Sequence, residues 1–367
     1  MSDLYIGLMS GTSLDGVDGV LVDFSGGRLQ VLQYATRPFP ADTRAELLAL
    51  NTPGSNELHR AALAANALVG VYADVVQLLL QQGGTSAAQI QAIGAHGQTV
   101  RHRPQEFDGT GYTLQLNNPA LLAERSGIRV VADFRSRDVA AGGQGAPLVP
   151  AFHSQVFGRA DTAVGVLNIG GISNLSVLDG PILGFDCGPG NALMDYWCQQ
   201  HTGQPYDADG AWAASGTVHA GLLAALLAEP YLAKAPPKST GRDLFNPPWL
   251  AARLQDFADL APVDVQATLT ELTASAIATC VSSYGNKSKL LIVCGGGALN
   301  GYLMQRLQAA LPAVQVQSSA AHGLPPLQVE AAAFAWLARQ TLLGAVGSLA
   351  SVTGACGDRV LGAIYPA

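Results

Sequence analysis

The opening of the chain alternates short apolar runs with turns that contain glycine. Residues 4–9 are apolar, residues 10–16 form a Ser- and Gly-rich turn, and residues 19–24 and 29–34 are two further apolar runs. Ser25, Gly26 and Gly27 separate the last two runs. Short apolar runs bounded by turn residues are typical of β-strands. The pattern predicts three strands joined by two tight turns.

The same pattern returns near the middle of the chain. Residues 162–169, 175–178 and 182–186 read as strands, and the first of them runs into a turn at residues 168–174. Apolar residues at helical spacing predict helices, and short apolar runs predict further strands. The expected helices cover residues 57–82, 119–126, 191–202, 218–228, 268–284, 301–310 and 328–343, and the expected strands cover residues 90–95, 112–116, 128–132 and 289–294. Strands that alternate with helices predict an α/β protein whose two halves open alike.

Length and composition narrow the class of protein. A chain of 367 residues favours two domains, and 49% hydrophobic against 13% charged residues can fill two cores. The net charge is −7, and the absence of Lys/Arg clusters among aromatic residues argues against a nucleic-acid partner. The first residues do not resemble a signal peptide, and Gly, Ser, Gln or Pro interrupt the longest uncharged stretches, 141–158 and 340–357. We therefore expect a cytoplasmic protein without membrane partners.

Cysteine and histidine spacing gives no sign of a metal site. Neither a CxxC nor an HExxH pattern occurs. Buried free thiols are the favoured interpretation of the five cysteines: Cys187, Cys198, Cys280, Cys294 and Cys356.

Three glycine-rich turns are candidates for phosphate binding: residues 10–16, 168–174 and 295–300. A phosphate chain needs backbone N–H groups that no Cβ shields. None of the three is a P-loop or a dinucleotide fingerprint, and each taken alone is more often only a turn. Two such turns facing each other across a cleft could hold a phosphate chain, and the third lies where open α/β sheets bind ligands. The combination predicts a nucleotide site.

Carboxylates accompany these turns. Asp15 and Asp18 lie in and after the first turn, and Asp186 ends an expected strand before Gly188, Pro189 and Gly190. A carboxylate at a strand end can serve as a base in a cleft. The alternatives are that Asp186 caps the helix near residue 191 or orders the turn, and that Asp18 faces solvent.

At these residues the sequence resembles the anhydro-N-acetylmuramic acid kinases, in the sugar kinase, heat-shock chaperone and actin superfamily. The most specific match is Gly-Leu-Met-Ser-Gly-Thr-Ser-Leu-Asp-Gly-Val-Asp at residues 7–18. Further matches lie at residues 94–99, 132–135, 143–150, 168–174, 186–191, 241–246, 294–297 with Asn300, and 330–331.

The resemblance implies a two-lobed actin-like ATPase fold with ATP in the interdomain cleft and Mg²⁺ on its phosphates. The lobes expected are 1–135, to which 345–367 returns, and 136–344. The implied reaction opens the 1,6-anhydro bridge with water, with Asp186 as the catalytic base, and phosphorylates O6 to give N-acetylmuramic acid 6-phosphate. The expected ATP-binding residues are Gly11, Thr12, Ser13, Leu14, Asp15, Gly16, Val17, Asp18, Asn168, Gly170, Gly171, Asn174, Gly295, Gly296, Gly297 and Asn300.

Three more residues are candidates for binding the amino sugar. Arg135 could pair with the lactyl carboxylate, and His96 and Glu330 could contact sugar hydroxyls. A structural ion pair is the alternative for Arg135, and a satisfied buried polar group is the alternative for the other two. Many superfamily members carry an aspartate at the end of the first strand, whereas residues 7–9 here are Gly, Leu and Met, so the ligands of the metal stay unknown.

Rival functions remain open from the sequence. One is a kinase for another amino sugar or a polyol. The other is a nucleotide-dependent switch without catalysis, as in the chaperone and actin branches, although no partner-binding segment stands out. The expected assembly is a homodimer.

Overall fold

The computed structural model describes residues 3–11, 13–241 and 244–367, which form two units. The first unit comprises Met1–Val156 and Gln328–Ala367, and the second comprises Phe157–Leu327. These limits differ from the lobes expected at 1–135 and 136–344. Helix α12 (Val329–Leu343) belongs to the first unit because it packs on two strands of that unit's sheet.

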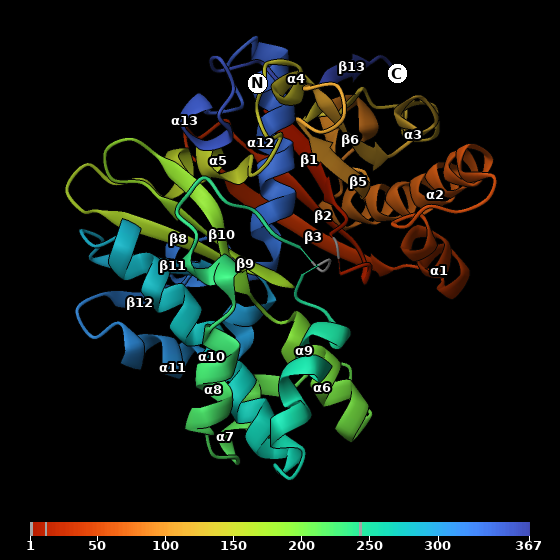
Figure 1. Ribbon diagram of the computed structural model, residues 1–367. Helices are drawn as coiled ribbons and strands as arrows, with labels where there is room; N and C mark the ends of the chain where they lie inside the picture. Colours follow the sequence, from red (N-terminus) through yellow and green to blue (C-terminus); the bar gives the residue numbers. More distant parts are fainter. Residues whose placement is uncertain (1–2, 12, 242–243) are drawn as a thin grey trace. The chain divides into compact units, whose positions relative to one another are not determined.

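The sheet of the first unit has the strand order β13-β7-β4-β1-β2-β3. Strands β1, β2 and β3 are antiparallel neighbours (Figure 1). Strands β1, β4 and β7 run parallel. The strands are β1 (Leu4–Met9), β2 (Gly16–Asp23), β3 (Gln30–Pro38), β4 (Ile90–Ala95), β7 (Val130–Ala132) and β13 (Ala363–Tyr365). A separate hairpin pairs β5 (Gln98–Pro104) with β6 (Gly111–Leu116).

The sheet of the second unit repeats this arrangement in the order β10-β9-β8-β11-β12. Its first three strands are antiparallel neighbours, and β8, β11 and β12 run parallel. The strands are β8 (Val164–Ile169), β9 (Ile172–Val177), β10 (Leu183–Pro189), β11 (Leu290–Cys294) and β12 (Gln315–Ser318). The α/β class is confirmed, and the repeated sheet is that of the actin-like ATPase fold expected from the sequence.

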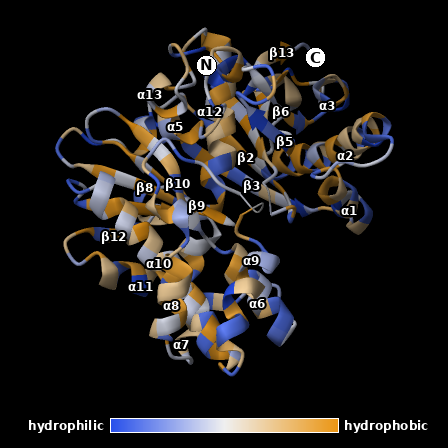
Figure 2. Cartoon of the chain, in the orientation of Figure 1, coloured by the Kyte–Doolittle hydropathy of each residue, from blue (hydrophilic) through white to orange (hydrophobic). Residues whose placement is uncertain are grey.

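Helices cover both faces of the first sheet. Helix α2 (Glu57–Gly83) packs on β2 and β3, and α12 packs on β1 and β4. Helix α2 is long and apolar enough to cross a membrane by composition, but its buried residues belong to the core of this unit. Figure 2 shows hydrophobic and hydrophilic residues along the same helix, as expected for one with a single buried face. The unit also contains α1 (Ala41–Ala49), α3 (Pro119–Ser126), α4 (Ser136–Ala140), α5 (Val149–Phe157) and α13 (Ala350–Thr353).

Two glycines let α12 approach the sheet closely. Gly7 of β1 and Gly94 of β4 are register partners on neighbouring parallel strands. A Cβ atom on Gly7 would overlap the carbonyl oxygen of Ala331, and one on Gly94 would overlap that of Phe334. The alanine-rich sequence of α12 also favours this close contact, because small side chains allow the helix backbone to lie near the strands. The packing fixes the start of α12, which carries Glu330.

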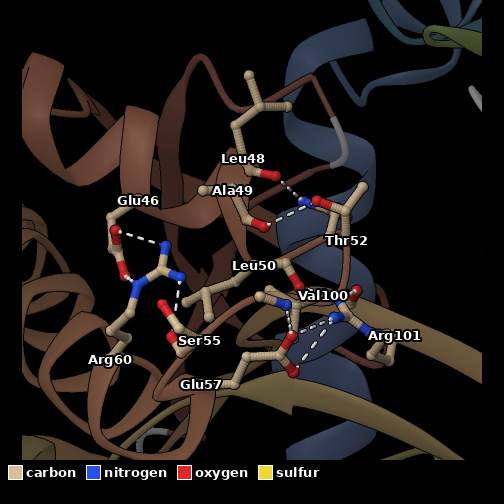
Figure 3. A network of polar contacts seen from close by, with 12 residues as sticks. Glu46, Leu48, Ala49, Leu50, Thr52, Ser55, Glu57, Arg60, Val100 and Arg101 are labelled. Atoms are coloured by element: carbon tan, nitrogen blue, oxygen red, sulfur yellow. Dashed lines mark hydrogen bonds and ion pairs between the residues drawn. The ribbon is translucent and has the colours of Figure 1, made fainter.

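Two arginines hold the connection between α1 and α2 (Figure 3). Arg60 donates from Nε to Glu46 Oε1 at 2.7 Å and from a terminal nitrogen to Glu46 Oε2 at 3.0 Å. Arg101 of β5 donates to the carbonyl of Leu50 and pairs with Glu57 at 3.4 Å. Such partly exposed pairs contribute little each, and here they link residues on both sides of the loop whose first residue, Leu50, is buried in the core.

In the second unit, α10 (Pro262–Tyr284) is buried along most of its length and packs against β9 and β10. Four helices pack on it: α6 (Ala192–Thr202), α7 (Ala211–Ala214), α8 (Ala220–Leu227) and α11 (Gly301–Ala310). Helix α9 (Pro247–Leu254) packs on α6 and α8. The core of the unit therefore forms between α10 and the sheet that carries Asp186.

Candidate active site

Hydrogen bonds to other residues of the first unit fix the first glycine-rich turn. The buried Ser10 shares a hydrogen bond with the Tyr72 hydroxyl at 3.0 Å and donates to the carbonyl of Gly97 at 3.0 Å. Gln98 donates from its amide to the carbonyl of Gly11 at 3.1 Å. The carbonyl of Gly11 therefore points into the unit. Thr12 lies outside the described residues.

The other predicted residues of this turn divide into two groups. Leu14 and Val17 are buried in the core, so their side chains anchor the turn. Ser13 is half-buried and Asp15 is exposed. Asp18 lies on β2 and accepts a hydrogen bond from the Tyr34 hydroxyl at 2.6 Å, which rules out a freely solvated side chain. Burial raises the pKa of Asp18.

Glycines in the three turns separate into those that the fold needs and those that it does not. Cβ atoms on Gly16, Gly295 and Gly297 would overlap Arg37, Asn168 and Ile169 respectively. By contrast, a Cβ on Gly11, Gly170 or Gly296 would have its nearest neighbour at 3.7, 3.7 or 3.4 Å. Each turn thus has one glycine that packing does not require. A glycine at such a place leaves the backbone open to close approach.

The second turn is joined to the residues that follow β10. The N–H groups of Gly190 and Asn191 donate to the carbonyls of Gly171 and Gly170 at 2.9 and 2.8 Å. Asn191 Nδ2 donates to the carbonyl of Ile169 at 3.2 Å and lies 3.4 Å from the Cβ position of Gly296. Asn191 therefore bonds to the second turn and lies beside the third, a position that the sequence analysis missed because nothing local distinguishes this asparagine.

The remaining predicted ATP-binding residues in the second unit surround these turns. Asn168 is buried and is the register partner of Asn174 across β8 and β9. Gly295 N donates to the carbonyl of Pro326 at 3.1 Å. Asn300 caps α11 by accepting from the N–H of Leu303 at 2.9 Å, so its side-chain oxygen already has a structural partner.

Asp186 does not end its strand, as the sequence suggested, but lies inside β10 at a register irregularity before Gly188. Its Oδ2 accepts from the backbone N–H of Thr240 at 2.9 Å. Helix α6 has Asn191 at its N-cap position and no side-chain cap bond, so capping by Asp186 is excluded. Burial raises the pKa of Asp186 to about 6, although the Thr240 hydrogen bond and the charge of Lys238 oppose this.

The three predicted sugar-binding residues meet in the first unit. Arg135 donates to His96 Nε2 at 2.9 Å and to the carbonyl of Gly145 at 2.7 Å. His96 Nδ1 lies 3.2 Å from the carbonyl of Ser10, so the neutral imidazole donates there and accepts from the guanidinium. Burial and Arg135 lower the pKa of His96 to about 3. Both ring nitrogens of His96 are thus used to hold Arg135.

Glu330 completes this group electrostatically. Burial and the negative charge of Asp18 raise the pKa of Glu330 to about 7, while Arg135 opposes the shift. Burial also lowers the pKa of Arg135 to about 10. Asp18, Glu330 and Arg135 therefore form one coupled set of charges. The N–H donors of a guanidinium in such a set can bind an anionic or hydroxyl-rich ligand.

Comparison with known proteins identifies the family. The family model described as anhydro-N-acetylmuramic acid kinase matches residues 3–367. A protein of that name from Variovorax paradoxus is 70% identical over 372 residues, covering 100% of this chain and 99% of its own. Another from Albidiferax ferrireducens is 67% identical over 389 residues, covering 100% of both chains. The chain belongs to the anhydro-N-acetylmuramic acid kinase family.

In the part of this kinase that the structure describes, the side chains form no metal centre of their own. Among residues 3–11, 13–241 and 244–367, no three His, Cys, Asp or Glu side chains form a group that could hold a metal ion. A cation carried mainly by phosphate oxygens and water, as is usual for Mg²⁺, needs no such group. Arg242 and Asp243, which belong to a family motif, lie outside the described residues.

The cysteines of the kinase follow the sequence prediction with one exception. Cys187, Cys198, Cys280 and Cys294 are buried thiols, whereas Cys356 is exposed. Cys187 follows Asp186 directly, and burial raises its pKa.

Proposed function

We propose that this kinase transfers the γ-phosphoryl group of ATP to O6 of 1,6-anhydro-N-acetylmuramic acid and hydrolyses the anhydro bridge. The match to the family over residues 3–367 is the observation that carries this assignment. The product is N-acetylmuramic acid 6-phosphate. The enzyme works in the cytoplasm on this small-molecule sugar, as a homodimer.

Asp186 is the proposed base. It takes a proton from water as the water oxygen bonds to C1 of the sugar, and the C1–O6 bond breaks. O6 keeps that electron pair and attacks the γ-phosphorus, and ADP leaves. The reaction therefore needs one base, Asp186, and one oxygen, O6, that accepts the phosphoryl group in line with the leaving ADP. A pKa of about 6 suits this task, because the carboxylate is ionised near neutral pH yet remains a useful proton acceptor.

The three turns are the proposed phosphate-binding elements. Gly11, Gly170 and Gly296 let the backbone approach ATP, and the other residues of the turns position them. When bound with the nucleotide, Mg²⁺ would supply positive charge against the charge that spreads over the transferred group.

The sugar is proposed to bind at the charged set of the first unit. Arg135 pairs with the lactyl carboxylate, Glu330 accepts from a sugar hydroxyl, and His96 keeps the guanidinium in place. Since His96 has no ring nitrogen left for the sugar, its contribution is to orient Arg135.

Mass spectrometry of products tests the reaction. The enzyme is incubated with ATP, Mg²⁺ and 1,6-anhydro-N-acetylmuramic acid in ¹⁸O-labelled water, and we expect a phosphorylated sugar with one labelled oxygen at C1. 1,6-Anhydro-N-acetylglucosamine, which lacks the lactyl group, is the matched control and should react poorly. Equal use of the control would indicate a kinase for another sugar, and ADP without phosphorylated sugar would indicate a nucleotide switch.

Replacing Gly11 by valine tests the phosphate role of the first turn. The Cβ position is free, so thermal stability should change little, whereas ATP binding should weaken because the side chain blocks the backbone. Isothermal titration with a non-hydrolysable ATP analogue and thermal unfolding measure the two effects. Gly16→Val is the contrasting variant, because its Cβ would overlap Arg37 and unfold the turn. A Gly11→Val protein that binds the analogue normally would remove this turn from the ATP site.

A further inference from the structure

The loop after η3 (Pro230–Ala233) holds Asp186 by its backbone on both sides. Asp186 N donates to the carbonyl of Lys238 at 3.2 Å, and Thr240 N donates to the Asp186 carboxylate at 2.9 Å. Because Asp186 lies at an irregular position of β10, the regular ladder does not determine its side-chain direction. The hydrogen bonds of Asp186 with Lys238 and Thr240 determine that direction instead.

Lys238 is buried, with 9% of its surface exposed, which is uncommon for a lysine. Its ammonium donates to the carbonyl of Leu232 at 3.2 Å and lies 5.0 Å from the centre of the Tyr231 ring. The Tyr231 hydroxyl in turn donates to the carbonyl of Asp186 at 3.0 Å. A buried charge needs partners, and those of Lys238 come from the short helix that also contacts Asp186.

We propose that Lys238 is a positioning residue of the kinase, whose ammonium ties this loop to η3 and so keeps the Asp186 carboxylate oriented. The proposal rests on the function proposed above for Asp186. Two effects of Lys238 are separable. The Leu232 and Tyr231 contacts fix the loop that supplies the Thr240 N–H, and the positive charge stabilises the ionised carboxylate.

Within residues 3–11, 13–241 and 244–367, few titratable groups act on Asp186. Tyr231 of η3 faces it, and burial raises the pKa of that phenol. Cys187 of β10 shares a hydrogen bond with Cys280 of α10, and burial raises the pKa of Cys187. Lys238 supplies the positive charge that opposes the effect of burial on the Asp186 pKa. Removing that charge should move the pKa upward.

The test is the pH profile of turnover for Lys238→Met, which keeps the apolar stem and removes the charge. The acid limb of kcat should move from near pH 6 to higher pH by roughly 1 unit or more, the size of effect that a neighbouring charge has on a carboxyl. The KM for ATP should stay within about twofold, since the side-chain contacts that Lys238 makes among the described residues are with Leu232 and Tyr231 of η3. Lys238→Arg should keep the limb in place, because the charge is retained.

Lys234→Met is the matched control. Lys234 lies 5.8 Å from the centre of the same Tyr231 ring but is exposed, and its loss should leave the profile unchanged. If Lys238→Met does not fold, Lys238→Gln keeps a donor for the Leu232 carbonyl without the charge and tests the same shift. An unmoved acid limb in the folded neutral variant overturns the role of Lys238. Failure of the proposed base would show differently, as normal turnover in Asp186→Asn.

Discussion

Asp186→Asn should reduce turnover by roughly 10²–10⁴-fold, the usual cost of losing a general base. The asparagine keeps the shape of the side chain, and its oxygen can still accept from the N–H of Thr240, but it cannot take a proton from water. Phosphoryl transfer falls together with ring opening, because O6 becomes a nucleophile only as C1–O6 breaks. A coupled assay of ADP release with 1,6-anhydro-N-acetylmuramic acid measures kcat, and calorimetry measures ATP binding, which should survive.

Asp186→Asn should be more stable than the parent protein at neutral pH, although its turnover falls. Burial raises the pKa of Asp186 above the value of an unfolded chain, so the folded protein binds the proton more tightly and becomes less stable as pH rises from about 4 through about 6. Asp186→Asn removes this cost, and its Tm should exceed that of the parent at pH 7.5, with a smaller difference near pH 4. If Asp186 only ordered the turn, its substitution would instead lower the free energy of unfolding by roughly 1 kcal/mol, comparable to the loss of a helix cap.

Asp179→Asn is the control for this substitution. Asp179 pairs with the exposed Lys287 at 3.7 Å, so its replacement should leave both turnover and stability nearly unchanged. An Asp186→Asn protein that folds, binds ATP and keeps near-normal turnover would leave the base unidentified.

Much of the fold could be predicted because local patterns decide it. The bounds of β1, β4, α3 and α11 agree with those expected from apolar runs and helical spacing. Strand β5 was missed since it contains Arg101, His102 and Arg103, and it belongs to a hairpin outside the main sheet. The short helices α1, α4 and α9 were also missed, because one or two turns give too few residues for a period to be seen.

The site could be predicted only where a single segment carries it. Glycine-rich turns can be recognised in the sequence, but the sequence does not show which of their glycines the packing of the fold requires. That distinction depends on partners far along the chain, as for Gly16 and Arg37. The contacts of Asn191 with Ile169, and of the loop at Thr240 with Asp186, likewise join distant segments. The irregularity in β10 that places Asp186 inside the strand has no local signal either.

Gly7→Ala should be strongly destabilising, although it adds a single methyl group. The new Cβ would overlap the carbonyl oxygen of Ala331 and lie 2.7 Å from the backbone nitrogen of Ala335. Both atoms belong to the backbone of α12, so the helix must move away from β1 as a whole. Overpacking of this kind costs about 1–3 kcal/mol and sometimes more. Since the first turn of α12 carries Glu330, the same shift should raise the KM for the sugar.

Fluorescence of Trp336 on α12 reports the movement, because its indole donates to Gln155 at 2.7 Å and the ring is buried in the parent. Thermal and urea unfolding, followed at this residue with a Trp336→Phe protein as the background, give the loss of stability. Gly26→Ala is the matched control: nothing lies within 4 Å of its Cβ position, so the same methyl group should be tolerated there. Equal stability of the two variants would show that α12 does not rest on Gly7, and the placement of Glu330 would then need another explanation.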